Sequence, residues 1–186
     1  MDEMYHELKS IFEQANQKLI TEDVELFEYD VNERTLCGAL KSHLEKIIST
    51  SKYSMYHVDV EYNRNRNGTV KTCCKFYDNG FPVPVKINCD LIVHSRGIII
   101  SQDNLIAIEM KKSTRPQESK DEDKIRLCAL TSDSYDGVWS FDGKTLPEHV
   151  CRYKLGVYYE INIAKRRTTL MYFYKGDIVE NHIISY

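Results

Sequence analysis

The sequence predicts an α/β protein in which helices cover a mixed central β-sheet. Two observations predict this class. Helical and strand patterns follow one another in the order helix, helix, several strands, helix, strand, strand. The late strand–helix–strand passage is typical of a right-handed parallel crossover within one sheet. At 186 residues the chain is long enough for a sizeable core, and no repeat or linker divides residues 1–186, so we expect a single domain.

Three helices are expected. Apolar residues recur at helical spacing over 3–20, and a second helix follows Asp30 and Asn32, either of which can cap it. Their apolar stripes are Met4, Leu8, Ile11, Phe12, Ala15 and Leu19 in the first helix, and Leu36, Leu40, Leu44, Ile47 and Ile48 in the second. The polar segment 113–123 is expected to be a loop, and residues 123–133 to form a helix of about three turns.

Strands are expected where aromatic and β-branched residues are concentrated. The first strand, over 53–65, is expected to turn at 63–68 and return over 69–77, and the segment 78–84 to break the pattern. Further strands are expected at 87–95, 104–112, 154–164 and 168–178, with a basic turn at 165–167. Residues 97–103 either extend the strand before them or form a short edge.

Composition and charge limit the classes of function. No apolar run is long enough to cross a membrane, and the acidic start "MDEMYHELKS" is unlike a secretory signal, so we expect a cytoplasmic protein without a membrane partner. The net charge of −3 means that any binding of nucleic acid must come from local basic patches. Such patches are Arg64 with Arg66, the run Lys111, Lys112 and Arg115, and the run 165–167.

One apolar strand ends abruptly in charged residues. Glu109 and Lys111 follow "LIAI", and side chains two apart on a strand share one face. Asp90 precedes the neighbouring strand, so pairing of the two strands would bring its carboxylate close to that of Glu109. Two adjacent carboxylates repel unless a cation or a shared proton relieves them. Mg²⁺, which binds oxygen ligands and keeps several waters, suits this arrangement.

The segments "CDLIVHSRG" and "NLIAIEMKKS" resemble the PD-(D/E)xK nucleases, the restriction-endonuclease-like superfamily, and in particular its small bacterial members. An upstream helix with an acidic residue, here Glu33 in "NERTLCGALKSHL", is similar as well, as are "VDVEYNR" and "DKIRLCAL". The resemblance covers roughly residues 30–165, so the helix at 3–20 can be an addition to the core. The residue before the aspartate is Cys89, where the family often has proline.

The resemblance implies a restriction-endonuclease-like fold and a set of site residues. Asp90, Glu109 and the backbone carbonyl of Met110 would bind Mg²⁺ or Mn²⁺, and Lys111 would be the catalytic lysine. Glu33 would add a further acidic group, binding metal directly or through water. The residues Lys112, Arg115, Arg64 and Arg66 would contact the nucleic-acid backbone.

Other interpretations of these residues remain open. Glu33 can form a capping box with Asp30, although its spacing from Leu36 and Leu40 places it on the buried face of its helix. Asp90 can be a turn residue, and Glu109 with Lys111 a surface ion pair, which would contribute little stability.

The sequence therefore favours a metal-dependent endonuclease of the defence, repair or junction-resolving type, acting on DNA rather than RNA. Such enzymes often work as homodimers, or with a partner protein in a larger system. The alternative is a non-catalytic nucleic-acid- or protein-binding module on the same fold. A third hypothesis is a hydrolase of small phosphoesters, which would need a closed pocket rather than an open groove.

Overall fold

The computed structural model describes residues 1–62, 72–78, 81–86, 89–133 and 151–186. Its main sheet has six strands in the order β1-β4-β5-β6-β7-β8. These are β1 His57–Val60, β4 Leu91–His94, β5 Asn104–Lys112, β6 Leu155–Asn162, β7 Arg167–Tyr174 and β8 Asp177–Ser185. All neighbours pair antiparallel except β5 and β6, which are parallel. A separate two-stranded sheet contains β2 Thr72–Asp78 and β3 Phe81–Lys86.

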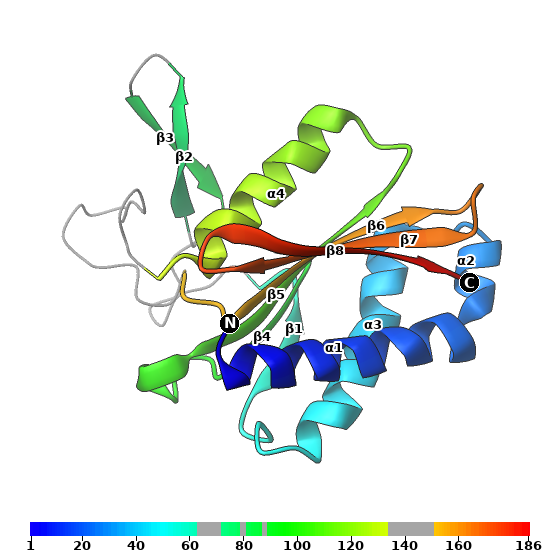
Figure 1. The fold of residues 1–186 in the computed structure, drawn as a ribbon, viewed down its shortest axis with the longest axis horizontal. Coiled ribbons are helices and arrows are strands. Elements are labelled where there is room, and N and C mark those ends of the chain that lie inside the picture. The colour runs from blue at the N-terminus through cyan, green and yellow to red at the C-terminus, as the bar shows by residue number, and fades with distance from the viewer. Residues whose placement is uncertain (63–71, 79–80, 87–88, 134–150) are drawn as a thin grey trace.

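Helices cover both faces of the main sheet (Figure 1). On one face lie α1 Glu3–Glu22 and α3 Glu33–Ser49, with the short α2 Val24–Glu28 between them in the chain. On the other face lies α4 Gln117–Thr131, which connects β5 to β6. The parallel crossover that the sequence predicts is therefore confirmed, as is the α/β class with a mixed sheet flanked by helices. No helix of the described residues is long and apolar enough to span a membrane.

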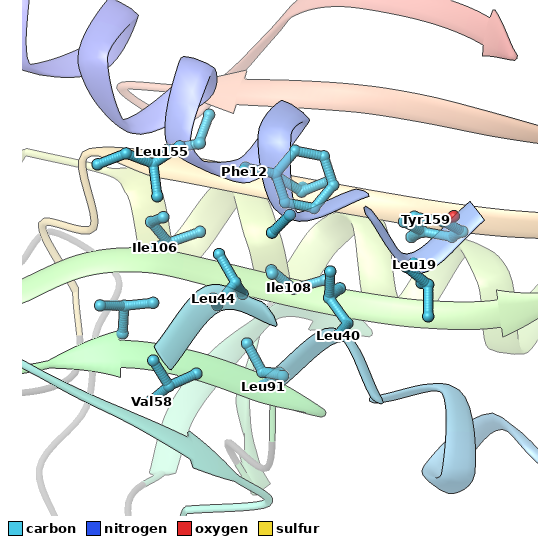
Figure 2. Close-up of a cluster of buried hydrophobic side chains, with 14 of the residues drawn as sticks. Phe12, Leu19, Leu40, Leu44, Val58, Leu91, Ile106, Ile108, Leu155 and Tyr159 are labelled. Carbon is cyan, nitrogen blue, oxygen red and sulfur yellow. The ribbon is translucent and has the colours of Figure 1, made fainter. Parts of the chain in front are cut away.

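The larger core lies between the sheet and the helices α1 and α3. Figure 2 shows side chains from both helices meeting those of the central strands. They include Phe12 and Leu19 from α1, Leu40 and Leu44 from α3, Ile106 and Ile108 from β5, and Leu155 and Tyr159 from β6. Because strand side chains alternate between faces, the intervening residues of β5 point toward α4 instead.

A smaller core lies under α4. It joins Leu127 and Leu130 of the helix to Ala107, Tyr158 and Phe173 of the sheet. Gly156 of β6 allows the close approach, because a Cβ there would lie 2.9 Å from both the Phe173 Cβ and the Thr131 Cγ2. The carboxyl-terminal half of α4 is thus fixed to the sheet by tight packing.

Side-chain caps fix where the two long helices begin. Asp2 accepts a hydrogen bond from the Tyr5 N–H at 2.9 Å, and Asn32 accepts one from the Thr35 N–H at 2.9 Å. Asn32, not Asp30, is therefore the cap of α3. Glu33 is the first residue of that helix, and its carboxylate bonds to β5 instead of forming a capping box with Asp30.

Several expected boundaries were wrong. The strand expected over 53–65 is only β1, 57–60, and turns precede it. The strand near 69–77 is β2, which pairs with β3 rather than with β1, and the supposed break at 78–84 contains the start of β3. Residues 100–102 form a 3₁₀ turn, 117–123 belong to α4, and 168–178 divides into β7 and the start of β8. The turn expected at 63–68 lies outside the described residues.

Candidate active site

The site is built on the edge of β5 that faces β4. Leu91, the first residue of β4, pairs with Ile108, so the last residues of β5 run past the start of its neighbour. Beyond the start of β4, two carboxylates accept the hydrogen bonds that a neighbouring strand would otherwise accept from β5. Asp90 Oδ2 accepts the Met110 N–H at 2.8 Å, and Glu33 Oε1 accepts the Lys112 N–H at 2.9 Å. Since the N–H and C=O of one strand residue point to the same side, the Met110 carbonyl faces this edge too.

The structure brings the side chains of Asp90 and Glu109 together. The two carboxyls lie close enough for each to affect the pKa of the other. Burial raises the pKa of Asp90, against the opposing effects of the Met110 N–H and the Lys111 charge. Burial also raises the pKa of Glu109 well above its usual range; Arg126 opposes this, and the charges of Asp90 and Asp123 add to it. Both carboxyls therefore lie where their ionised form is disfavoured, chiefly because they are buried.

Helix α4 supplies the partners of Glu109 and Lys111. Arg126 Nη1 lies 2.5 Å from Glu109 Oε1 and 3.1 Å from Asp123 Oδ1. Lys111 Nζ lies 2.9 Å from Asp123 Oδ2. Only 1% of the Glu109 side chain is exposed, and 3% of that of Asp123. Glu109 and Lys111 are thus not a surface ion pair with each other, because Glu109 is paired with the partly buried Arg126 and Lys111 with the buried Asp123.

The sequence interpretation missed Asp123 and Arg126. A signal was present, since Asp123, Leu127 and Leu130 recur at helical spacing and so share one face. A carboxylate on an apolar helix face needs a buried partner. The sequence predicts a loop over 113–123, however, and this prediction places Asp123 at the end of a helix rather than in its interior.

Glu33 lies on the other side of the sheet from Glu109 and Lys111. Its carboxylate accepts the Lys112 N–H and pairs with Arg115, whose Nε and Nη2 lie 2.9 and 3.0 Å from its oxygens. Burial raises the pKa of Glu33, but the hydrogen bonds from Arg115 and Lys112 outweigh it, so that this pKa is lowered. Glu33 therefore stays ionised, with its oxygens engaged in the contacts that hold α3 to β5.

A cavity of about 300 Å³ opens beside this edge of the sheet. It is lined by Asn32, Glu33, Arg34, Cys37, Val60, Glu61, Asp90 and Arg115. Arg34 Nη2 lies 2.7 Å from Glu61 Oε1, so both arginines of the lining are paired with carboxylates. The cavity therefore connects Asp90 and Glu33 to solvent past two guanidinium groups.

The residues expected to contact nucleic acid have different environments. Lys112 Nζ donates to the Asp30 carboxylate at 2.6 Å and to the Asp30 carbonyl at 3.0 Å, which ties β5 to the start of α3. Arg115 is exposed at the mouth of the cavity. Arg64 and Arg66 lie outside the described residues.

The donor groups fit a divalent cation in their chemistry. Two neighbouring carboxylates and a backbone carbonyl on the same edge are oxygen ligands of the kind that Mg²⁺ prefers. Their raised pKa values indicate a place where added positive charge would be stabilising. In the described part of the chain, however, no group of three or more His, Cys, Asp or Glu side chains is arranged to hold a metal ion. At Glu109 the guanidinium of Arg126 stands where such a cation would bind.

No protein-family model, curated protein or solved structure matched this chain. What the site can do is therefore judged from its geometry and chemistry.

Proposed function

We propose that this protein is a Mg²⁺- or Mn²⁺-dependent endonuclease with a restriction-endonuclease-like fold, related to the PD-(D/E)xK nucleases. The observation that carries the proposal is the proximity of the Asp90 and Glu109 carboxyls, with Lys111 on the same face of β5 as Glu109. The order of elements agrees with this, since α3, a run of strands and the crossover through α4 surround the site as the resemblance implies. DNA is favoured over RNA as the substrate.

Each residue has a role in this proposal. Asp90, Glu109 and the Met110 carbonyl would hold the cation, which when bound would stabilise the charge that develops on the scissile phosphate. Lys111 would orient the attacking water and donate a hydrogen bond to the phosphate. Asp123, 2.9 Å from the Lys111 Nζ, would keep that amine charged and in place. Burial lowers the pKa of Lys111, but Asp123, Asp90 and Glu109 outweigh it and the pKa is raised.

The arginines at the mouth of the cavity would contact the nucleic-acid backbone. Arg34 and Arg115 have 74% and 53% of their side chains exposed, so either can turn from its carboxylate to a phosphate. Contacts of this kind bind without reading sequence. Because each protein chain has one site, cutting both strands of a duplex would require a homodimer or a partner protein.

The test is a cleavage assay on linear, circular, single-stranded and branched DNA and on RNA, with Mg²⁺ or Mn²⁺. Glu109→Gln and Lys111→Met should each lower the cleavage rate at least a hundredfold. Glu118→Gln on α4 and Lys41→Met on α3 remove the same charges elsewhere and should cut within about threefold of wild type. If the wild-type protein leaves every substrate whole, or if Lys111→Met cuts normally, the proposal is wrong.

A second candidate, a non-catalytic binding module on the same fold, is favoured by one observation. Glu109 and Lys111 are already paired with Arg126 and Asp123, so these charges are balanced without a ligand. A module of this kind would bind nucleic acid or a protein without cutting it. In a fluorescence-anisotropy assay its affinity would be unchanged by Glu109→Gln, and lowered by Arg34→Ala with Arg115→Ala.

A further inference from the structure

Arg126 forms an ion pair with Glu109, one of the two carboxylates proposed to bind the cation. Its Nη1 lies 2.5 Å from Glu109 Oε1 and 3.1 Å from Asp123 Oδ1, so one guanidinium nitrogen contacts two carboxylates. Arg126 has 15% of its side chain exposed and Glu109 only 1%. Arg126 therefore both neutralises Glu109 and separates it from solvent.

The charges around Glu109 would favour binding of a further cation, or of one that replaces Arg126. Lys111 and Arg126 are paired with the carboxylates of Glu109 and Asp123, and the carboxylate of Asp90 lies near enough to both carboxylates and to Lys111 to interact with their charges. A divalent cation at Asp90 and Glu109 would offset the negative charge of these carboxylates. It would also repel the guanidinium of Arg126, because like charges a few ångströms apart in a buried site interact strongly.

Arg126 is not held by a full set of hydrogen bonds. Its Nε is buried without a hydrogen-bond partner among the residues that the structure describes. An arginine that leaves a buried donor unpaired forgoes part of the stabilisation that a fully bonded guanidinium would provide. Its release from Glu109 therefore breaks fewer contacts than its burial suggests.

Helix α4 carries Arg126 directly before Leu127. Its carboxyl-terminal half is packed on the sheet through Leu127, Leu130 and the close contact at Gly156. Its amino-terminal half is anchored as well, because the buried Lys120 bonds to the Ser113 carbonyl and pairs with Glu160. With the helix in place, a change of the Arg126 rotamer would uncover Glu109 without unpacking the core.

We propose that Arg126 acts as an internal competitor of the metal ion, occupying Glu109 until a divalent cation displaces it. This inference rests on the proposed function, since it takes Asp90 and Glu109 as the metal ligands. Metal binding would then be coupled to release of Arg126 toward solvent, where its guanidinium is free to contact the nucleic-acid backbone. The cation would be held weakly while Arg126 is paired with Glu109.

The inference is tested by binding of Mn²⁺ alone, followed by electron paramagnetic resonance of the free ion. Arg126→Met should bind Mn²⁺ at least tenfold more tightly than the wild-type protein. Lys124→Met removes a positive charge from the same helix without touching Glu109, and should stay within about twofold of wild type. The gain should vanish in the double variant Arg126→Met with Glu109→Gln. A gain that persists in the double variant, or no gain at all, overturns the inference.

A second variant guards against loss of the fold, because Arg126→Met leaves Glu109 buried without its partner. Arg126→Gln keeps a neutral donor for Glu109, and should also bind Mn²⁺ more tightly, with a far-ultraviolet circular dichroism spectrum like that of wild type. Equal Mn²⁺ affinity in wild type and variants, abolished by Asp90→Asn, would overturn the competitor role and leave the nuclease proposal standing. No Mn²⁺ binding in any variant would overturn both.

Discussion

Asp123 is the side chain that pairs with two partly buried cations, Lys111 and Arg126. It accepts contacts from Lys111 and Arg126 and is almost completely buried. We expect Asp123→Asn to lower the free energy of unfolding by about 1.5–3 kcal/mol, because hydrogen bonds to charged groups are lost in a buried site. Urea denaturation measures this. Asp121→Asn on the same helix removes an exposed partner of Lys124 and should lower the free energy of unfolding much less. Equal losses in the two variants would contradict a structural role for the pairs beneath α4.

The positions of single residues could be predicted from the sequence only where pairing of neighbouring strands decides them. Asp90 lies beside Glu109 because β4 and β5 pair antiparallel through a short connection, and the sequence indicates both strands. The alternation of β5 likewise separates Lys111 from Lys112. The partners on α4 could not be predicted in the same way, because they depend on how a helix docks on a sheet.

Gly156 and Gly38 differ in how closely other atoms surround them, so the same substitution to alanine can be compared at the two positions. A Cβ at Gly156 would lie 2.9 Å from Phe173 and Thr131, whereas one at Gly38, inside α3, would meet nothing within 4 Å. We expect Gly156→Ala to destabilise the protein by about 1–3 kcal/mol through overpacking. Gly38→Ala should stabilise it by about 0.5–1 kcal/mol, because alanine favours the helix. Thermal unfolding of both variants checks the signs; a tolerated Gly156→Ala would mean that α4 docks less tightly than described.

The helices and strands show why the sequence predicts the type of an element more reliably than the residues at which it begins and ends. The helix over 3–20 and the strand over 104–112 were right because their apolar residues repeat over many positions. The last strand was missed because Lys175 and Gly176 turn the chain in only two residues, both with positive φ. This is the turn that joins tight hairpins, and glycine at its second position was the one signal in the sequence. The first half of α4 was missed because it contains no apolar residue: the two side chains that it buries, Lys120 and Asp123, are charged and leave no apolar pattern in the sequence.

Glu180 joins the two ends of the molecule, since its carboxylate on β8 bonds to Tyr5 and Lys9 of α1 and to His182. Burial raises its pKa, but these hydrogen bonds outweigh it and lower the pKa from 4.5 to about 2. The unfolded chain therefore binds this proton more tightly, so Glu180 stabilises the fold above pH 4.5 and loses this effect as the pH falls toward 2. Glu180→Gln should be less stable than wild type at pH 7, with a gap that closes in acid. Urea denaturation at pH 7, 4 and 3 measures the gap; a gap that does not narrow, or one equal to that of Glu118→Gln, would contradict this prediction.

Binding of a cation at Asp90 and Glu109 should stabilise the whole molecule, because the ion binds the folded chain and not the unfolded one. At a Mg²⁺ concentration a hundred times the Kd, the gain is about 2.7 kcal/mol, or roughly 5–10 °C in Tm for a chain of this size. Asp90→Asn keeps an oxygen that can accept the Met110 N–H, so it should fold and yet lose the Mg²⁺-dependent rise. NaCl at equal ionic strength controls for screening of surface charges. Since Arg126 opposes the ion in our proposal, Arg126→Gln should show the larger rise at low Mg²⁺. An equal rise in wild type and Asp90→Asn would mean that Mg²⁺ binds elsewhere on the protein, and neither proposal about this site would survive.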